Sequence, residues 1–163
     1  RVHMHPFEAN YLGLGYKGPF RTYAQAFFSV PFCASLAWLH GTVTFEGLHR
    51  FDDTAILALV DRIHVVSDPA RERYKPLIQV VLKSGSILEW RDEQGEKGYE
   101  LDWSAAVDMT QALCAEVGID RKHSDALIDV ASRIEALETP APLISAAKAF
   151  AVATRKAAAL APG

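Results

Sequence analysis

Cysteine is scarce in this sequence, with two residues among 163. Cys33 and Cys114 both stand in apolar helical patterns, so we expect two buried, reduced thiols. So few cysteines argue against a domain held together by disulfides. This usage is typical of a cytoplasmic protein, and we expect that location.

An excess of basic charge is also absent. Seventeen Lys and Arg oppose 20 Asp and Glu, for a net charge of −3, and the basic residues are scattered. We therefore expect neither a nucleic-acid partner nor an anionic membrane partner. The longest nearly apolar run, Phe27–Leu39, is too short to span a bilayer, and no signal-peptide pattern is visible. The sequence opens on Arg1 without an initiating Met, and we expect a cut or processed beginning.

Several common functional motifs are missing or fail in their context. No G-x-S-x-G occurs, so Ser29 has no nucleophile elbow around it. Gly13, Gly15 and Gly18 match G-x-G-x-x-G, but Pro19 follows where the phosphate-binding helix should already run. His3-x-His5 has metal-ligand spacing without accompanying ligands, so we expect an exposed polar strand face. The sequence thus predicts no metal site and no cofactor.

The most informative stretch that is present runs from Tyr16 to Gly41 and is rich in aromatic and apolar residues. Ser is a preferred N-cap and Pro31 is tolerated in a first turn, so the spacing predicts a helix over Ser29–His40, closed by Gly41. Residues 21–28 would form an approach segment, read as a short helix at an angle. Because the main helix is apolar on nearly every side, we expect it to be buried against several elements.

The rest of the chain predicts short strands followed by helices. Predicted strands are Val2–Met4, extending towards Pro6, then Ile63–Val66, Leu77–Leu82 and Ile87–Trp90, the last two joined at Ser84-Gly85. A short turn over residues 45–51 is capped by Thr44, a helix follows Asp52 or Asp53, and residues 93–98 form a solvated loop. Three C-terminal helices are predicted over residues 102–118, 124–137 and 143–160.

These elements predict an α+β fold: a two-layer α/β sandwich, with a small antiparallel sheet packed on the buried helix, followed by a C-terminal helical segment. Residues 1–101 would form the α+β unit and residues 102–163 the C-terminal helices. The residues expected to face inward on the first two C-terminal helices are Val107, Met109, Leu113, Val117, Leu127, Val130, Ile134 and Leu137.

A candidate binding site lies just before the main helix. Lys17 and Arg21 flank Gly18-Pro19-Phe20 and precede the helix start at Ser29, where free N–H groups attract anions. Two cations near such groups form a plausible clamp for a carboxylate. The alternative is that both cations are solvated loop charges.

Residues 18–41 resemble a known family. G-P-F, then A-Q-A-F-F-S-V-P-F-C-A-S-L-A-W-L-H-G, are similar to the block of the MmgE/PrpD family in which an Ala-Gln pair leads to S-x-x-[YF] and an Ala- and Leu-rich run ending in Gly. The order continues with Phe51-Asp52-Asp53, Leu59, Ile63 and Val65, an Asp-Pro, a strand ending at residues 83–85 and a helical region near Trp103. The resemblance covers roughly residues 12–150.

The resemblance implies metal-free chemistry on small di- or tricarboxylic acids, in which a proton is removed next to a carboxylate. The family contains 2-methylcitrate dehydratase, cis-aconitate decarboxylase and iminodisuccinate epimerase. It also implies a large helical domain and a smaller α+β domain with the active site between them. The present chain resembles the later part of the small domain, incomplete at its start, plus the C-terminal helices.

Two departures from the family pattern bear on activity. The catalytic Lys and His of the family lie in a K-P-Y-P-x-C-x-x-H-type segment, which nothing in this sequence matches. Phe32 stands where the family often has a Tyr that contributes a hydroxyl, and Phe cannot donate a proton. No catalytic residue is therefore assigned to this chain, and the predicted substrate-binding residues are Lys17, Arg21, Ser29 and Phe32.

Two functions follow. In the first, the chain is part of an MmgE/PrpD-type lyase, dehydratase or epimerase, and the remaining active-site groups lie on another segment or chain. In the second, it is a non-catalytic binding or assembly module that kept the fold without the chemistry. The expected partners are a small di- or tricarboxylic acid and either a second copy, in a homodimer, or a chain carrying the helical domain.

Overall fold

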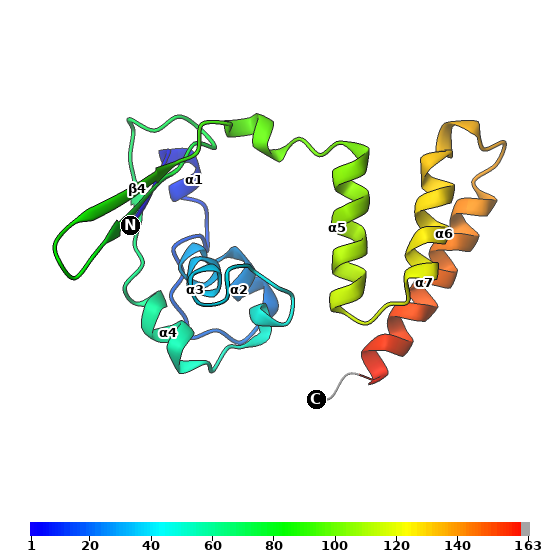
Figure 1. Cartoon of the computed structure of the whole chain (residues 1–163), viewed down its shortest axis with the longest axis horizontal. Coiled ribbons are helices and arrows are strands. Elements are labelled where there is room, and N and C mark those ends of the chain that lie inside the picture. The colour runs from blue at the N-terminus through cyan, green and yellow to red at the C-terminus, as the bar shows by residue number, and fades with distance from the viewer. Residues whose placement is uncertain (161–163) are drawn as a thin grey trace. The chain divides into compact units, whose positions relative to one another are not determined.

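The fold is α+β with helices at the C-terminal end, as the sequence predicts (Figure 1). A computed structural model describes residues 1–160, with side chains up to residue 155. The chain divides into two compact units, Arg1–Glu100 and the part from Leu101 onward, and each is described by itself. Among the residues described, no helix is long and apolar enough to cross a membrane.

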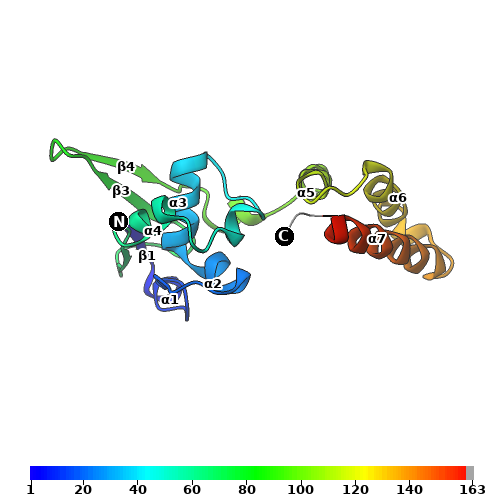
Figure 2. The same cartoon turned by 90° about the horizontal axis from the view of Figure 1, so that it is seen from below.

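A four-stranded sheet belongs to the first unit, with the strand order β2-β1-β3-β4 (Figure 2). The antiparallel hairpin of β3 (Leu77–Val81) and β4 (Ile87–Arg91) is confirmed, with Gln79 opposite Glu89. However, β1 (Val2–Met4) pairs in parallel with β2 (Val65–Ser67), so the sheet is mixed and not wholly antiparallel as predicted. A parallel pair needs a long crossover, and the helical residues between β1 and β2 provide it.

The main helix of the first unit begins and ends at the predicted capping residues. α2 (Tyr23–Phe28) opens on a capping box of Thr22 and Gln25, and α3 (Val30–His40) follows directly. α3 has Ser29 as its N-cap and Gly41, with φ of 79°, as its C-cap, which confirms the predicted bounds. The other helical segments are α1 (Pro6–Ala9), η1 (Gly47–His49), α4 (Thr54–Val60) capped by Asp53, and η2 (Gly95–Tyr99).

Two of these segments correct the prediction from the sequence. Pro6 begins α1 and does not extend the strand, because a Pro at the first helical position costs no hydrogen bond. Residues of the predicted solvated loop 93–98 form most of η2, which Asp92 initiates by accepting the N–H groups of Gln94 and Gly95.

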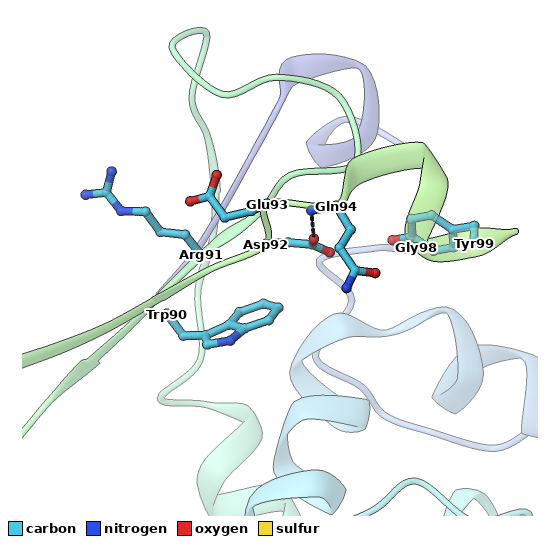
Figure 3. Close-up of a pocket in the computed structure, with 7 residues that line it drawn as sticks. All are labelled: Trp90, Arg91, Asp92, Glu93, Gln94, Gly98 and Tyr99. Carbon is cyan, nitrogen blue, oxygen red and sulfur yellow. Dashed lines mark hydrogen bonds between the residues drawn. The ribbon is translucent and has the colours of Figure 1, made fainter.

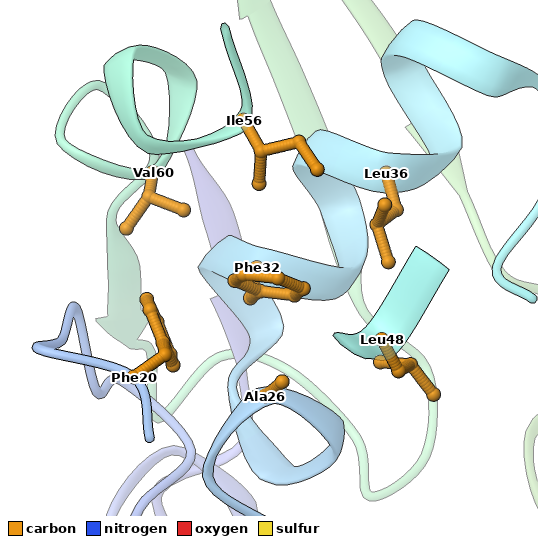
Figure 4. Close-up of a cluster of buried hydrophobic side chains, with 7 residues drawn as sticks. All are labelled: Phe20, Ala26, Phe32, Leu36, Leu48, Ile56 and Val60. Atoms are coloured by element: carbon orange, nitrogen blue, oxygen red, sulfur yellow. The ribbon is translucent and has the colours of Figure 1, made fainter. Parts of the chain in front are cut away.

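The core of the first unit lies between helices. Figure 4 shows the Phe32 ring of α3 among side chains from α2, α4 and η1. Its ring centroid is 4.6 Å from that of Phe20. The buried cluster comprises Phe20, Ala26, Phe32, Leu36, Leu48, Ile56 and Val60.

The expectation that α3 is buried on every side is therefore wrong. One face, with Pro31, Phe32, Ser35 and Leu36, is buried, whereas Trp38 is 63% exposed and Leu39 is 40% exposed. Its main packing partners are α4, α2 and η1, and the strands are not among them, so the expected packing of this helix across the sheet is also wrong. The apolar surface of α3 is larger than the part that its three helical neighbours cover.

The second unit consists of helices. α5 (Trp103–Glu116) and α7 (Ala141–Leu160) both pack on α6 (Arg121–Ser132), and η3 (Ile134–Ala136) follows α6 (Figure 1). Asp102 caps α5 by accepting the Ala105 N–H at 2.7 Å, as predicted. Part of the inward set is wrong, because Met109, Leu113 and Ile134 are about half exposed. Instead, Cys114, Ile119 and Ser124 are the buried residues, since α6 covers only part of the apolar face of α5.

Replacing Phe32 with Ala should lower the free energy of unfolding by about 3–5 kcal/mol, because it empties the middle of the buried cluster. Phe27→Ala is the matched control. Phe27 is 51% exposed and stacks on Tyr23, so its loss should cost about 1 kcal/mol. Urea unfolding followed by the fluorescence of Trp38 and Trp90 compares the two variants, and equal losses would contradict this assignment of the core.

Candidate functional site

Ser29 sits at the junction of α2 and α3 and is fully buried. Its Oγ accepts the N–H of Phe32 at 3.1 Å and donates to the carbonyl of Tyr16. The hydroxyl thus ties the start of α3 to the preceding loop. Both its donor and an acceptor site are in use, so Ser29 acts here as a structural cap.

The N–H groups at the start of α3 are also in use. Val30 donates to the Leu14 carbonyl at 2.9 Å, Cys33 donates to the Ser29 carbonyl at 2.9 Å, and Pro31 has no N–H to offer. With Phe32 bonded to Ser29, the first turn has no unpaired donor. The expectation that free N–H groups at this helix start hold an anion is therefore wrong, because the loop at Leu14 folds back over the helix end.

Phe32 occupies the middle of the core and has no solvent-exposed surface. The predicted site residues Ser29 and Phe32 are thus brought together by packing. Neither presents an atom at the surface of this unit. Whether either contacts a substrate stays a prediction.

Lys17 is the predicted site residue with the most informative surroundings. Its Nζ donates to the Asp61 carbonyl at 2.9 Å and lies 3.5 Å from Nδ1 of His64. Asp61 is the C-cap of α4, where the partial negative charge of the helix dipole attracts a cation. The ammonium has three donors, so a held Lys17 still has hydrogen-bonding capacity for a ligand.

Arg21 plays a different part. Its backbone N–H donates to Oε1 of Gln25 at 2.7 Å and so supports the start of α2. The residue is exposed, and its guanidinium forms no hydrogen bond or ion pair with another residue in the described part of the chain. The structure therefore joins Lys17 to Asp61 and His64, and it gives Arg21 the character of a solvated loop charge.

Asp61 and His64 were missed by sequence reasoning. They lie 44 and 47 residues after Lys17, and no local motif links them. The parallel pairing of β1 with β2 positions His64, whose carbonyl accepts the Val2 N–H at 2.8 Å. Only that non-local pairing could have indicated the contact.

Two cavities of the first unit carry charges that oppose a carboxylate ligand. The larger, of about 500 Å³, is lined by Trp90, Arg91, Asp92, Glu93, Gln94, Gly98 and Tyr99. Figure 3 shows Arg91 extending away from Asp92, and its guanidinium pairs with Glu89 at 3.2 Å. The smaller cavity, of about 310 Å³, has Glu8 as its charged residue. Lys17 therefore remains the better candidate for attracting a carboxylate.

Neither His3 nor His5 forms the exposed polar strand face that the sequence predicts. His3 is 18% exposed at its side chain, with Nε2 3.0 Å from Oε1 of Gln79 and Nδ1 3.6 Å from Asp68. Nδ1 of His5 accepts the Phe7 N–H and caps α1. Among the residues described, no group of three or more His, Cys, Asp and Glu side chains could hold a metal ion.

Both cysteines are free thiols, as predicted, but only Cys114 is buried. Cys33 is half-buried, and its Sγ lies 3.3 Å from the Phe27 carbonyl and 3.5 Å from the Ala26 carbonyl. Burial raises the pKa of the Cys33 thiol. The thiolate is therefore disfavoured, and the thiol lacks the electropositive setting of a nucleophile.

Replacing Ser29 with Ala should lower the free energy of unfolding by about 2 kcal/mol, because the Phe32 N–H and the Tyr16 carbonyl both lose a partner. Ser35→Ala is the matched control on the same helix. Its hydroxyl only bonds back to the Pro31 carbonyl at 2.8 Å, so its loss should cost less than about 1 kcal/mol. Urea unfolding measures the free energy of unfolding of both variants. A decrease for Ser29→Ala that is no larger than the decrease for Ser35→Ala would contradict the cap role.

Comparison with known proteins identifies a family. The family described as MmgE/PrpD C-terminal domain matches residues 1–136. No curated protein matches the chain.

Proposed function

Since this chain belongs to the MmgE/PrpD family, matching its C-terminal domain over residues 1–136, we propose that it is part of a lyase, dehydratase or epimerase. The proposed substrate is a small di- or tricarboxylic acid, from which a proton next to a carboxylate is removed without a metal ion. The family match is the observation that carries this proposal. The two free thiols also suit the cytoplasmic location that we propose.

In this proposal Lys17 attracts a substrate carboxylate. Lys17 is partly buried as a residue, and its ammonium is held at the C-terminal end of α4 by the Asp61 carbonyl. A side chain that is already ordered loses less conformational freedom when a ligand binds. His64, 3.5 Å away, places a second polar group beside it. Arg21 is the weaker candidate, since its guanidinium is exposed and not held.

Proton transfer is assigned to groups outside this chain. Phe32 carries no ionisable group, and the sequence has no K-P-Y-P-x-C-x-x-H segment to supply the Lys and His. We therefore propose that a helical domain, on another segment or chain, brings these groups to the Lys17 side of the α+β unit. A second copy in a homodimer is the other arrangement of subunits that we consider.

An exposed aromatic surface supports the proposal of a covering domain. Tyr23, Phe27 and Phe28 of α2 lie beside Phe45 and His49, with the Tyr23 centroid 5.6 Å from Phe27 and 5.3 Å from Phe45. All five are exposed in this chain. Contiguous exposed apolar patches commonly mark interaction surfaces. We propose that the helical domain covers this surface in the complete enzyme.

A titration tests the role of Lys17. Citrate or succinate should shift the amide resonances of residues 16–18 and 61–64 only at high ligand concentration, because a partly exposed ion pair with Lys17 contributes only about 0–1 kcal/mol. Lys17→Ala should weaken the effect several-fold. Lys83→Ala removes the same charge at the exposed β3–β4 turn and is the control. Equal weakening by both substitutions would mean that net charge, and not this site, attracts the ligand.

A second measurement tests the assignment of catalysis to another domain. The isolated chain should exchange no substrate proton with D₂O and should not turn over 2-methylcitrate, cis-aconitate or iminodisuccinate. Adding a separately produced helical domain of the family that carries the Lys and His segment should give activity, which Lys17→Ala reduces. Turnover by the chain alone would mean that one of its own histidines or lysines is the base. No activity in any combination would favour the non-catalytic binding module.

A further inference from the structure

A second site with the opposite charge preference lies in the first unit. The cavity of about 310 Å³ is formed by the end of β1, by α1 and the loop after it, by the segment before β3 and by η2. Its volume is at the lower end of the range for small-molecule sites in proteins. The lining residues are Met4, Phe7, Glu8, Tyr11, Leu14, Tyr74, Pro76 and Tyr99.

Glu8 is the charged residue of this cavity, and half of its carboxylate is unpaired. Oε1 accepts the N–H of Tyr74, which fixes the orientation of the group. Oε2 is buried and has no hydrogen-bond partner among the residues described. A buried carboxylate oxygen without a partner is unfavourable, and none of the residues that line the cavity carries a positive charge to pair with it.

Aromatic rings form much of the remaining wall. Four of the eight lining residues are Phe7, Tyr11, Tyr74 and Tyr99. The rings of Tyr74 and Tyr99 meet at 65° with their centroids 5.7 Å apart, so they form two sides of a corner. Phe7, Tyr11 and Tyr99 are each more than half exposed, which leaves ring surface available.

The electrostatics of the wall favour a cation. The Phe7 ring already contacts a cation, since the guanidinium carbon of Arg73 lies 4.4 Å from the ring centroid. Partial burial raises the pKa of the Tyr99 phenol, and the carboxylates of Asp92 and Glu8 raise it further. The Tyr99 ring therefore lies in the negative electrostatic field of these two carboxylates.

We propose that this cavity binds an organic cation with a quaternary or methylated ammonium group, surrounded by aromatic rings and opposed in charge by Glu8. Aromatic cages are the usual protein sites for such head groups. A quaternary ammonium has no N–H to donate, so it can neutralise Glu8 at short range without a hydrogen bond to the buried Oε2. A hard metal ion does not fit, because one carboxylate supplies too few oxygen ligands.

This site is independent of the proposed polycarboxylate chemistry. Glu8 repels a carboxylate, and none of the residues that line the cavity is among those assigned to the Lys17 site. The cation would thus be a second ligand, an effector or a group on a partner. Failure of either proposal leaves the other unaffected.

NMR titration of the whole chain with choline chloride tests the proposal, with sodium chloride at equal ionic strength as a blank. Choline should shift the amides around Glu8, Tyr74 and Tyr99, whereas its uncharged isostere 3,3-dimethylbutan-1-ol should bind at least about tenfold more weakly. A peptide bearing trimethyl-lysine, titrated in parallel, distinguishes a protein side chain from a free small molecule. Binding of either cation supports the site.

Substitutions then assign the binding to named residues. Glu8→Gln keeps an acceptor for the Tyr74 N–H but removes the charge, and it should weaken choline binding about tenfold. Tyr99→Leu removes one side of the corner without touching the carboxylate and should weaken it several-fold. Glu93→Gln, in the other cavity, is the matched charge control and should have little effect. The proposal is overturned if neither choline nor the trimethyl-lysine peptide binds, or if choline and the alcohol bind equally. It is also overturned if Glu8→Gln and Tyr99→Leu both bind choline normally.

Discussion

The first unit depends most on the two hydrogen bonds made by the Ser29 hydroxyl. This hydroxyl lies where the chain turns from α2 into α3, and it joins the Tyr16 carbonyl to the Phe32 N–H. With this bond made, the Phe32 ring enters the space between α2, α4 and η1. The bond to Tyr16 also fixes the residue that precedes Lys17 in the loop. One buried polar contact therefore positions both the core and the candidate site.

Local elements could be predicted because their signals are local. Ser29 and Gly41 bound α3, and Asp53 starts α4, since a capping side chain or a left-handed residue acts within one turn. The partner of an apolar face is not local. Composition shows that Trp38 and Leu39 are apolar, but not that the residues described leave both of them partly exposed. The parallel pairing of β1 and β2 was missed for the same reason, because about sixty residues separate them.

The candidate site divides in the same way. Lys17 could be identified from the sequence as a cation near a helix start, but the groups that its ammonium contacts come from the end of α4 and from His64. The anion site at Ser29 was expected because isolated helix starts have unpaired N–H groups. It fails because the carbonyl of Leu14, sixteen residues earlier in the chain, accepts the Val30 N–H. A cap supplied by a distant loop leaves no trace in local spacing.

If the proposed polycarboxylate function holds, the energies involved call for a second surface beside this unit. A solvent-exposed charge pair contributes about 0–1 kcal/mol, whereas millimolar binding already requires about 4 kcal/mol and micromolar binding about 8 kcal/mol. Lys17 alone cannot supply that difference, and the acidic cavities at Glu8 and Asp92 oppose the same ligand. In the proposed enzyme, tight binding would come from groups that face Lys17 across an interface, where water is excluded and charges interact more strongly. An exposed aromatic surface on the same α+β unit is what such an interface would bury.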